Sequence, residues 1–303
     1  MKLLFNFLIF PGFLFSVIVG LMACWVDRKV SARLQWRVGP PWYQNFVDII
    51  KLWGKETIVP EDAKVTFLFA PYIGLLSLVL VATILGRALI WPQSGFSADL
   101  IVVFYLLAIP AISLIIGSSS SRNPLASVGA SREMKLVLSY ELPFILSIIA
   151  VIIKSGGAIQ LETILNSQSL FKSHIASLSG TLAFAVAIFC AMGKSGLGPF
   201  EISEAEQEIM GGTLIEYSGV PLSVFKLNKA LMLYVMPVFL TMLFLGKDLS
   251  PVFMSLKFVM ILVIFILVKN TNPRMRIDQA MRFFWIYMTI PAVLAVALAV
   301  FGL

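Results

Sequence analysis

The run VTFLFAPYIGLLSLVLVATILGRALI, residues 65–90, decides the fold class of this chain. Its one charged residue is Arg87, and a helix needs about 20 predominantly apolar residues to cross a bilayer. Runs of the same character occur at 3–26, 98–117, 136–154, 178–193, 222–245, 251–269 and 283–302. We therefore predict an all-α, polytopic membrane protein in which residues 1–303 form a single transmembrane domain with about eight transmembrane helices.

The composition of the chain favours the same class. Of its 303 residues, 59% are hydrophobic and 13% are charged, which is typical of integral membrane proteins. The net charge of +7 agrees with basic loops that lie next to anionic lipid headgroups. We therefore expect the lipid bilayer as a partner, and no nucleic acid.

Metal-binding patterns are missing from the sequence. Cys24 and Cys190 lie far apart and form no CxxC motif, which argues against a zinc or iron–sulfur site. His174 stands alone in a predicted loop, where we expect it at the surface. We expect no metal and no cofactor in this chain.

The basic residues are distributed unequally over the connections between the spans. Seventeen of the 23 Lys and Arg residues lie in or beside alternate connections. By the positive-inside rule these connections are predicted to be cytoplasmic. Both termini then lie on the outer side of the cell membrane. The cytoplasmic connections are about 27–64, 118–135, 194–221 and 270–282.

The first cytoplasmic connection contains a predicted amphipathic helix, WYQNFVDIIKLWGKE, at 42–56. Trp42 and Trp53 recur on an apolar face, and Asp48 and Lys51 lie on the opposite face. The helix is too short and too charged to span, so we expect it in the interface plane. Its role stays open: the helix only lies on the lipid surface, or it walls an opening to a cavity or supports a docked subunit.

A cationic stretch, DRKVSARLQWRVGPP at 27–41, precedes this helix. Gly39, Pro40 and Pro41 end any helix there. The cations either anchor the span end at the interface or pair with carboxylates of a partner or of the acidic connection at 194–221. They are Arg28, Lys29, Arg33 and Arg37.

The connection at 118–135 leads into a span that contains a carboxylate. We predict that Ser131 caps a helix starting at Arg132, so that Glu141 lies more than two turns inside it. Pro143 should kink this helix and admit water. A glutamate within a span is either half of a structural pair or part of an ion relay, and we favour the relay.

The acidic stretch KSGLGPFEISEAEQEIMGGTLIEYSG, residues 194–219, is the strongest functional candidate. We predict a helix from Phe200 to Gly211 that carries Glu201, Glu204 and Glu208 on one face. Carboxylates so close together repel one another, which raises pKa values and suits proton exchange. A merely solvated loop is the alternative. The candidate relay residues are Glu141, Glu201, Glu204, Glu206, Glu208 and Glu216.

Four motifs, DRKVSARLQWRVGP, DIIKLWGKE, GASRE…SYE and GPFEISEAEQEIMGG…EYSG, occur in this order. Together they resemble the heel membrane subunit of respiratory complex I, which also occurs in energy-converting membrane-bound NiFe hydrogenases and related sulfur reductases. The resemblance implies a non-catalytic membrane subunit of an oxidoreductase complex that pumps H⁺ or Na⁺. Docking or counter-charge roles fall to Arg28, Lys29, Arg33, Arg37, Asp48 and Arg132.

The resemblance also implies partners. These are hydrogenase-like large and small soluble subunits and antiporter-like membrane subunits. The partners would hold a NiFe or related metal centre and iron–sulfur clusters, while this chain docks the soluble redox arm and relays charge.

Two alternative functions remain open. The first is a quinone-binding heel subunit of a respiratory NADH or ferredoxin:quinone oxidoreductase, although Gly39-Pro40 runs almost directly into the amphipathic helix, as in the hydrogenase branch. Respiratory members have a longer stretch there that contributes to the quinone chamber. The second is a stand-alone secondary transporter, which predicts an internal repeat that the sequence does not show.

Overall fold

The structure is a computed structural model that describes residues 2–61, 63–90, 99–171, 173–246 and 251–302. All regular elements in these ranges are helical. The long helices are α2 (Phe13–Leu34), α4 (Thr66–Ile90), α5 (Asp99–Ser120), α6 (Pro124–Lys154), α8 (Leu178–Lys194), α10 (Gly219–Leu240) and α11 (Pro251–Thr271). The last span consists of α12 (Ile277–Arg282), the π-helical segment η5 (Phe283–Met288) and α13 (Thr289–Val300). The shorter elements are α1 (Lys2–Leu8), α3 (Gln44–Trp53), α7 (Leu161–Phe171), η2 (His174–Ala176), α9 (Glu206–Ile209), η3 (Gly212–Leu214) and η4 (Thr241–Leu245).

The predicted membrane class is confirmed. Seven helices in the described ranges are long and apolar enough to cross a bilayer. The run predicted at 178–193 forms α8, a helix of 17 residues. At 1.5 Å per residue α8 is about 25 Å long, slightly less than a ~30 Å hydrocarbon core.

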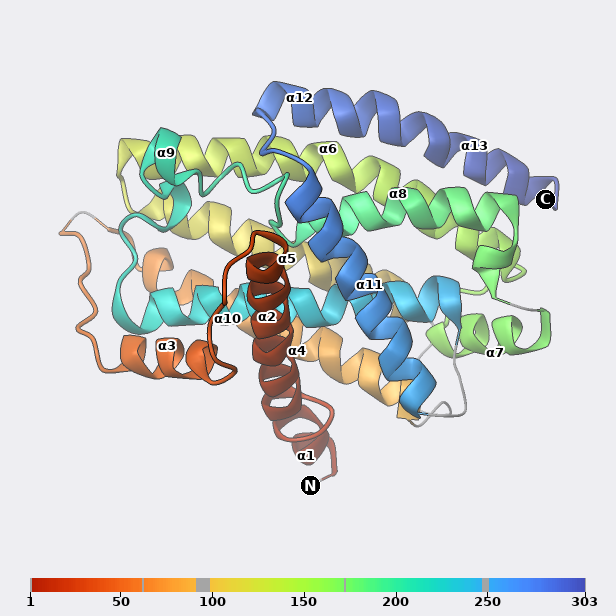
Figure 1. Cartoon of the computed structure of the whole chain (residues 1–303), viewed down its shortest axis with the longest axis horizontal. Helices are drawn as coiled ribbons and strands as arrows, with labels where there is room; N and C mark the ends of the chain where they lie inside the picture. The colour runs from red at the N-terminus through yellow and green to blue at the C-terminus, as the bar shows by residue number, and fades with distance from the viewer. Residues whose placement is uncertain (1, 62, 91–98, 172, 247–250, 303) are drawn as a thin grey trace.

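Helix α10 lies at the centre of the bundle. In its apolar stretch 89% of the residues are buried inside the chain, against 22% for α11 and for the last span. Figure 1 shows α10 running across the middle of the molecule, with α2 and α11 crossing it. Gly20 of α2 permits this close crossing, because a Cβ there would lie 2.7 Å from the carbonyl oxygen of Ala230. Residues of α10 are therefore positioned by packing on several sides.

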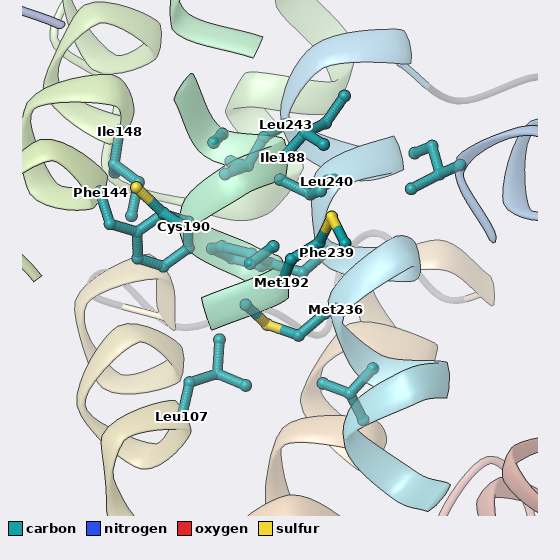
Figure 2. Packing of buried hydrophobic residues seen from close by; sticks show 14 of the residues in the cluster. Leu107, Phe144, Ile148, Ile188, Cys190, Met192, Met236, Phe239, Leu240 and Leu243 are labelled. Atoms are coloured by element: carbon teal, nitrogen blue, oxygen red, sulfur yellow. The ribbon is translucent and has the colours of Figure 1, made fainter. Parts of the chain in front are cut away.

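A second group of packed helices consists of α6, α8 and the last span, which lie together above α10 in Figure 1. Figure 2 shows the core between α6, α8 and α10, where Phe144 of α6, Cys190 of α8 and Phe239 of α10 lie close to one another. Cys190 is fully buried and acts here as a small apolar side chain.

The amphipathic helix predicted in the first connection is present as α3. Ile49 and Leu52 are buried, while Trp42 and Trp53 are 58% and 57% exposed. Trp53 Nε1 donates a hydrogen bond of 3.0 Å to the hydroxyl of Ser223 at the start of α10. The helix therefore packs on α10, and the indole rings of Trp42 and Trp53 remain partly exposed on its outer side. Exposed tryptophans of this kind suit a helix at the bilayer interface.

The predicted start of the fourth span was wrong. Helix α6 begins at Pro124, because Asn123 Oδ1 accepts the backbone N–H of Leu125 at 2.8 Å and a proline at the first helical position is already in helical geometry. Ser131 caps nothing, and its hydroxyl donates to the carbonyl of Val128 within the helix. Glu141 consequently lies between four and five turns from the start of α6 rather than just over two.

The predicted acidic helix was also wrong. Only Glu206–Ile209 is helical, and it ends at Met210, which has a left-handed backbone with φ of 53°. The preceding residues form turns whose backbone groups bond to distant segments. The Met275 N–H donates to Pro199 O at 3.0 Å, and Thr213 N–H donates to Ser203 O at 3.4 Å. Tertiary partners replace the local helical hydrogen bonds.

His174 was expected at the surface, but it is buried, with 7% of its surface exposed. Its Nε2 lies 3.0 Å from the Ser155 hydroxyl in the loop after α6. Burial lowers the pKa of His174 to about 4, and the Lys154 charge contributes in the same direction. The imidazole therefore stays neutral in the folded protein at pH values where it is protonated in an unfolded chain.

This lowered pKa predicts acid sensitivity. Below the ordinary histidine pKa of about 6.5 the unfolded chain binds a proton that the folded chain rejects, so stability falls as the pH drops toward 4. In His174→Gln the loss of apparent Tm between pH 7.5 and pH 5.0 should be smaller than in wild type by about 3 °C. Thermal denaturation of the purified complex at the two pH values measures this. Equal losses in the two proteins would contradict it.

Candidate functional site

Ionisable side chains gather around a cavity where the acidic stretch folds over α6, α8 and α10. The cavity has a volume of about 60 Å³ and is lined by both carboxylates and amines. This space is sufficient for a few water molecules. The ionisable residues that line it are Glu133, Lys194, Glu201, Glu204 and Lys229.

Lys229 of α10 holds the acidic stretch in place. Its Nζ lies 2.5 Å from Glu204 Oε2 and 3.3 Å from Glu201 Oε1. Arg274, in the connection between α11 and α12, places Nη2 at 3.3 Å from Glu201 Oε2. Two cations thus balance two carboxylates, which relieves the repulsion that Glu201 and Glu204 would otherwise feel.

Glu133 forms the wall of the cavity on α6. It is 6% exposed and lies in the same lining as Ser203 and Glu204. Gly129, one turn earlier, lets the acidic stretch approach α6 closely, because a Cβ there would lie 2.7 Å from the Thr213 nitrogen. A buried carboxylate therefore faces the Lys229 cluster from the opposite side.

A second ion pair lies deeper in the bundle. Lys194 Nζ at the end of α8 is fully buried and lies 2.9 Å from Glu141 Oε1. The contact is off the hydrogen-bonding direction, and neither the second oxygen of Glu141 nor the Tyr140 hydroxyl has a hydrogen-bond partner in the described part of the chain. Such unsatisfied groups are usual where water or a proton is exchanged.

Aromatic rings complete the surroundings of Lys194. Its Nζ lies 4.8 Å from the ring centroid of Phe104, 5.1 Å from Phe144 and 5.7 Å from Tyr140. Cation–π contacts in a desolvated position are worth about 2 kcal/mol or more. They offset part of the cost of burying the ammonium group away from water.

The two ion pairs belong to one arrangement, because Lys194 also lines the cavity that holds Glu204 and Lys229. Ionisable groups therefore follow one another from the acidic stretch at the surface, through Lys229 and Glu133, to Lys194 and Glu141. This arrangement can move charge by small displacements of protons and water.

The other acidic residues lie elsewhere, so the predicted shared face of Glu201, Glu204 and Glu208 was wrong. Glu208 Oε2 lies 2.5 Å from Arg132 Nη1, and the exposed Glu206 lies beside it on α9. Glu216 Oε1 accepts from Asn123 Nδ2 at 2.5 Å. These contacts fasten the middle and the C-terminal part of the acidic stretch to the first turns of α6 and to Asn123, the residue before it.

The cationic stretch at the end of α2 does not balance the acidic stretch. Arg28 Nη1 instead lies 2.6 Å from Asn45 Oδ1 and 3.3 Å from Asp48 Oδ2, which joins α2 to α3. Asp27 accepts from Lys269 of α11 at 2.7 Å. Within this chain Arg28 therefore pairs with Asp48 of α3 rather than with the acidic stretch. The remaining cations are the half-buried Lys29 and the exposed Arg33 and Arg37.

Sequence reasoning missed the partners of the carboxylates. Lys194 and Lys229 counted only as basic residues near span ends, and Glu133 counted only as part of the GASRE motif. The available signal was that each lies within or next to an apolar run, where an ionisable group needs a partner. In the described part of the chain, no group of His, Cys, Asp and Glu residues has the arrangement of a metal site.

Comparison with known proteins identifies the family. The NADH dehydrogenase family model matches residues 7–300. The chain belongs to this family. One subunit of the NADH-quinone oxidoreductase of Thermomicrobium roseum is 33% identical, over 94% of this chain and 92% of the relative. The corresponding subunit of Bacillus cytotoxicus is 30% identical, over 92% and 90%.

A solved structure has the same fold. A chain of the membrane-bound sulfane sulfur reductase, an archaeal respiratory membrane complex, superposes with a TM-score of 0.90 at 29% identity, over 99% of this chain and 100% of that one. This NADH dehydrogenase family chain is thus a multi-span membrane subunit of a complex I-like, multisubunit respiratory oxidoreductase in the cell membrane.

The buried ion pair generates a prediction about assembly. Removing the amine in Lys194→Met leaves the Glu141 carboxylate without its counter-charge, which should cost about 3 kcal/mol. The double variant Lys194→Met, Glu141→Gln should recover more than half of that loss, because no charge is then left unpaired.

The apparent Tm and the yield of the assembled complex measure these effects. Lys226→Met is the matched control, since Lys226 lies on α10 but is exposed, and it should behave as wild type. A Lys194→Met complex as stable as the control would show that the pair does not stabilise the bundle.

Proposed function

We propose that this chain docks a soluble redox arm onto the membrane and couples it to ion translocation, in a complex of the membrane-bound hydrogenase and sulfur-reductase type. The observation that carries this proposal is the continuous set of ionisable groups from Glu201 and Glu204 to Glu141. One end lies in the connection available to a docked subunit, and the other lies inside the bundle. A stand-alone docking platform needs no such arrangement.

Charge would move through this arrangement by changes in ion pairing. Lys229 contacts both Glu201 and Glu204, so protonation of Glu204 weakens one contact and leaves the ammonium group to Glu201. The field at Glu133 and Lys194 then changes, because both line the same cavity. A displacement of Lys194 finally alters the tendency of Glu141 to hold a proton. In this scheme Glu206, Glu208 and Glu216 position the stretch or meet a partner.

The basic side of the molecule would be the docking surface. We propose that it is cytoplasmic, as the distribution of basic residues indicates. The exposed Arg33, Arg37 and Glu206 offer charges of both signs to hydrogenase-like large and small soluble subunits. Those subunits would hold the metal centre and the iron–sulfur clusters. The lateral neighbours would be antiporter-like membrane subunits that carry out ion translocation.

The packing around α3 favours the hydrogenase and sulfur-reductase branch over a quinone-binding role. The chain passes from the end of α2 at Leu34 to the start of α3 at Gln44 through a short connection. The space between α2, α3 and α10 is filled by Leu21, Ile49 and Leu227. The curated relatives belong by name to NADH-quinone oxidoreductases, so quinone reduction is the second candidate.

Substitution of the two key carboxylates tests the relay. In the complexes that assemble, Glu141→Gln and Glu204→Gln should leave electron transfer intact, and should each lower the number of ions moved per electron at least several-fold. The amide keeps the shape of the carboxyl side chain but cannot bind and release a proton near neutral pH. Glu162→Gln, on α7 outside the cavity, is the control and should pump normally.

The measurement is ion uptake by inverted membrane vesicles during redox turnover, with and without Na⁺. Normal pumping in both variants would remove the relay and leave only docking. The partners are tested separately by mass spectrometry of what co-purifies in mild detergent. A homogeneous single subunit with transport activity, or turnover that requires a quinone, would replace the proposed function by one of the two alternatives.

A further inference from the structure

A groove on the basic side of the molecule lies outside the carboxylate–lysine cavity. It has a volume of about 430 Å³ and is formed by α8, the connection between α11 and α12, and the start of the last span. Its polar end is lined by Asn272, Arg274, Gln279 and Arg282. Carboxylates are absent from the described lining, so this end of the groove presents two guanidinium groups, of which Arg274 also contacts Glu201 outside the lining.

The other end of the groove is aromatic. Phe189 of α8 and Phe283 of η5 lie with ring centroids 5.4 Å apart in an edge-to-face arrangement. Phe283 also approaches Phe200 at 5.6 Å and Tyr287 at 6.5 Å. Tyr287 is 66% exposed, so the groove opens sideways from this wall. The wide turn of the π-helical segment brings Phe283 and Tyr287 to the same wall.

The two ends lie at different depths. Arg274 follows the end of α11, and Arg282 ends α12, so both guanidinium groups lie where spans leave the apolar layer. Phe283 and Tyr287 lie up to a turn further along the last span. Cations at the boundary above aromatic surface match the order of groups in a phospholipid, in which the phosphate precedes the acyl chains.

We propose that this groove binds one anionic phospholipid from the leaflet on the basic side. The phosphate lies between Arg274 and Arg282, with Asn272 and Gln279 as additional donors, and an acyl chain lies along Phe189 and Tyr287. Arginine suits phosphate because its planar fork donates two parallel hydrogen bonds. The absence of a lining carboxylate favours a headgroup with net negative charge over a zwitterionic one.

Arg274 can serve this ligand and Glu201 together. Its contact with Glu201 uses Nη2 at 3.3 Å, and a guanidinium group has five N–H donors. Arg282 is exposed and lines the same groove. Substituting Arg282 therefore removes a phosphate ligand without disturbing the Glu201 ion pair.

Native mass spectrometry of the intact, delipidated complex tests the proposal with phosphatidylglycerol and phosphatidylcholine as probes. In Arg282→Gln, phosphatidylglycerol binding to this chain should weaken about tenfold, the effect of losing one charge-assisted hydrogen bond. Arg276→Gln is the matched control, because Arg276 is exposed on the same connection but does not line the groove, and it should bind as wild type. Phosphatidylcholine should bind weakly to all three proteins.

Other occupants give different results. Displacement of phosphatidylglycerol by millimolar inorganic phosphate would indicate a free-phosphate site and overturn the proposal. A photoreactive amino acid in place of Tyr287 should cross-link to lipid in the membrane, and cross-linking to another protein of the complex instead would also overturn it. Equal phosphatidylglycerol binding by the Arg282→Gln and Arg276→Gln variants would also overturn the proposal. Each readout is independent of ion pumping.

Discussion

The ion pairs between Lys229 and the two carboxylates Glu201 and Glu204 determine how the basic side of this protein is built. Lys229 lies on α10, the most buried span, and its ammonium group needs a counter-charge there. The acidic stretch supplies it from a turn, in which both Glu201 and Glu204 contact the amine. These ion pairs fix the acidic stretch against α10.

The elements that the sequence predicted correctly are those set by local patterns. Continuous apolar runs located the spans, and the alternating faces of residues 44–53 located α3, because periodicity and length are properties of neighbouring residues. The start of α6 was missed although Asn123-Pro124 is itself a strong helix start. Gly129 is a helical residue of α6 at a close contact with the acidic stretch.

The candidate site was predicted only in part, and the reason is physical. The clustering of glutamates and the isolation of Glu141 in an apolar run are visible in the sequence. Their partners are not, since Lys229 and Lys194 meet them across distances of tens of residues, and no local pattern specifies which amine meets which carboxylate. Glu133 was missed for the same reason. In the sequence it resembles any charged residue near a span end, and only the packing of α6 against the acidic stretch puts it in the cavity wall.

The geometry of the Lys194–Glu141 pair supports the proposed relay. Burying an ion pair often costs more in desolvation than it returns, and an apolar pair of similar size packs as well or better. This pair is also imperfect, with an off-axis contact and an unbonded carboxylate oxygen. A pair retained for stability would have its lone pairs satisfied, as Glu201 does between Lys229 and Arg274. The unsatisfied groups of Glu141 and Tyr140 instead leave room for a water molecule or a proton to bind and leave.

Arg274 connects the surface of the protein to this interior arrangement. It contacts Glu201, which shares Lys229 with Glu204, and Lys229 lines the cavity with Lys194. In the proposed scheme, a negative charge near Arg274, on a lipid phosphate or on a docked protein, shares the guanidinium group with Glu201, and that carboxylate then depends more on Lys229. Glu204 shares the same amine. The shared use of a few cations would thus link the membrane surface to charge pairing inside the bundle.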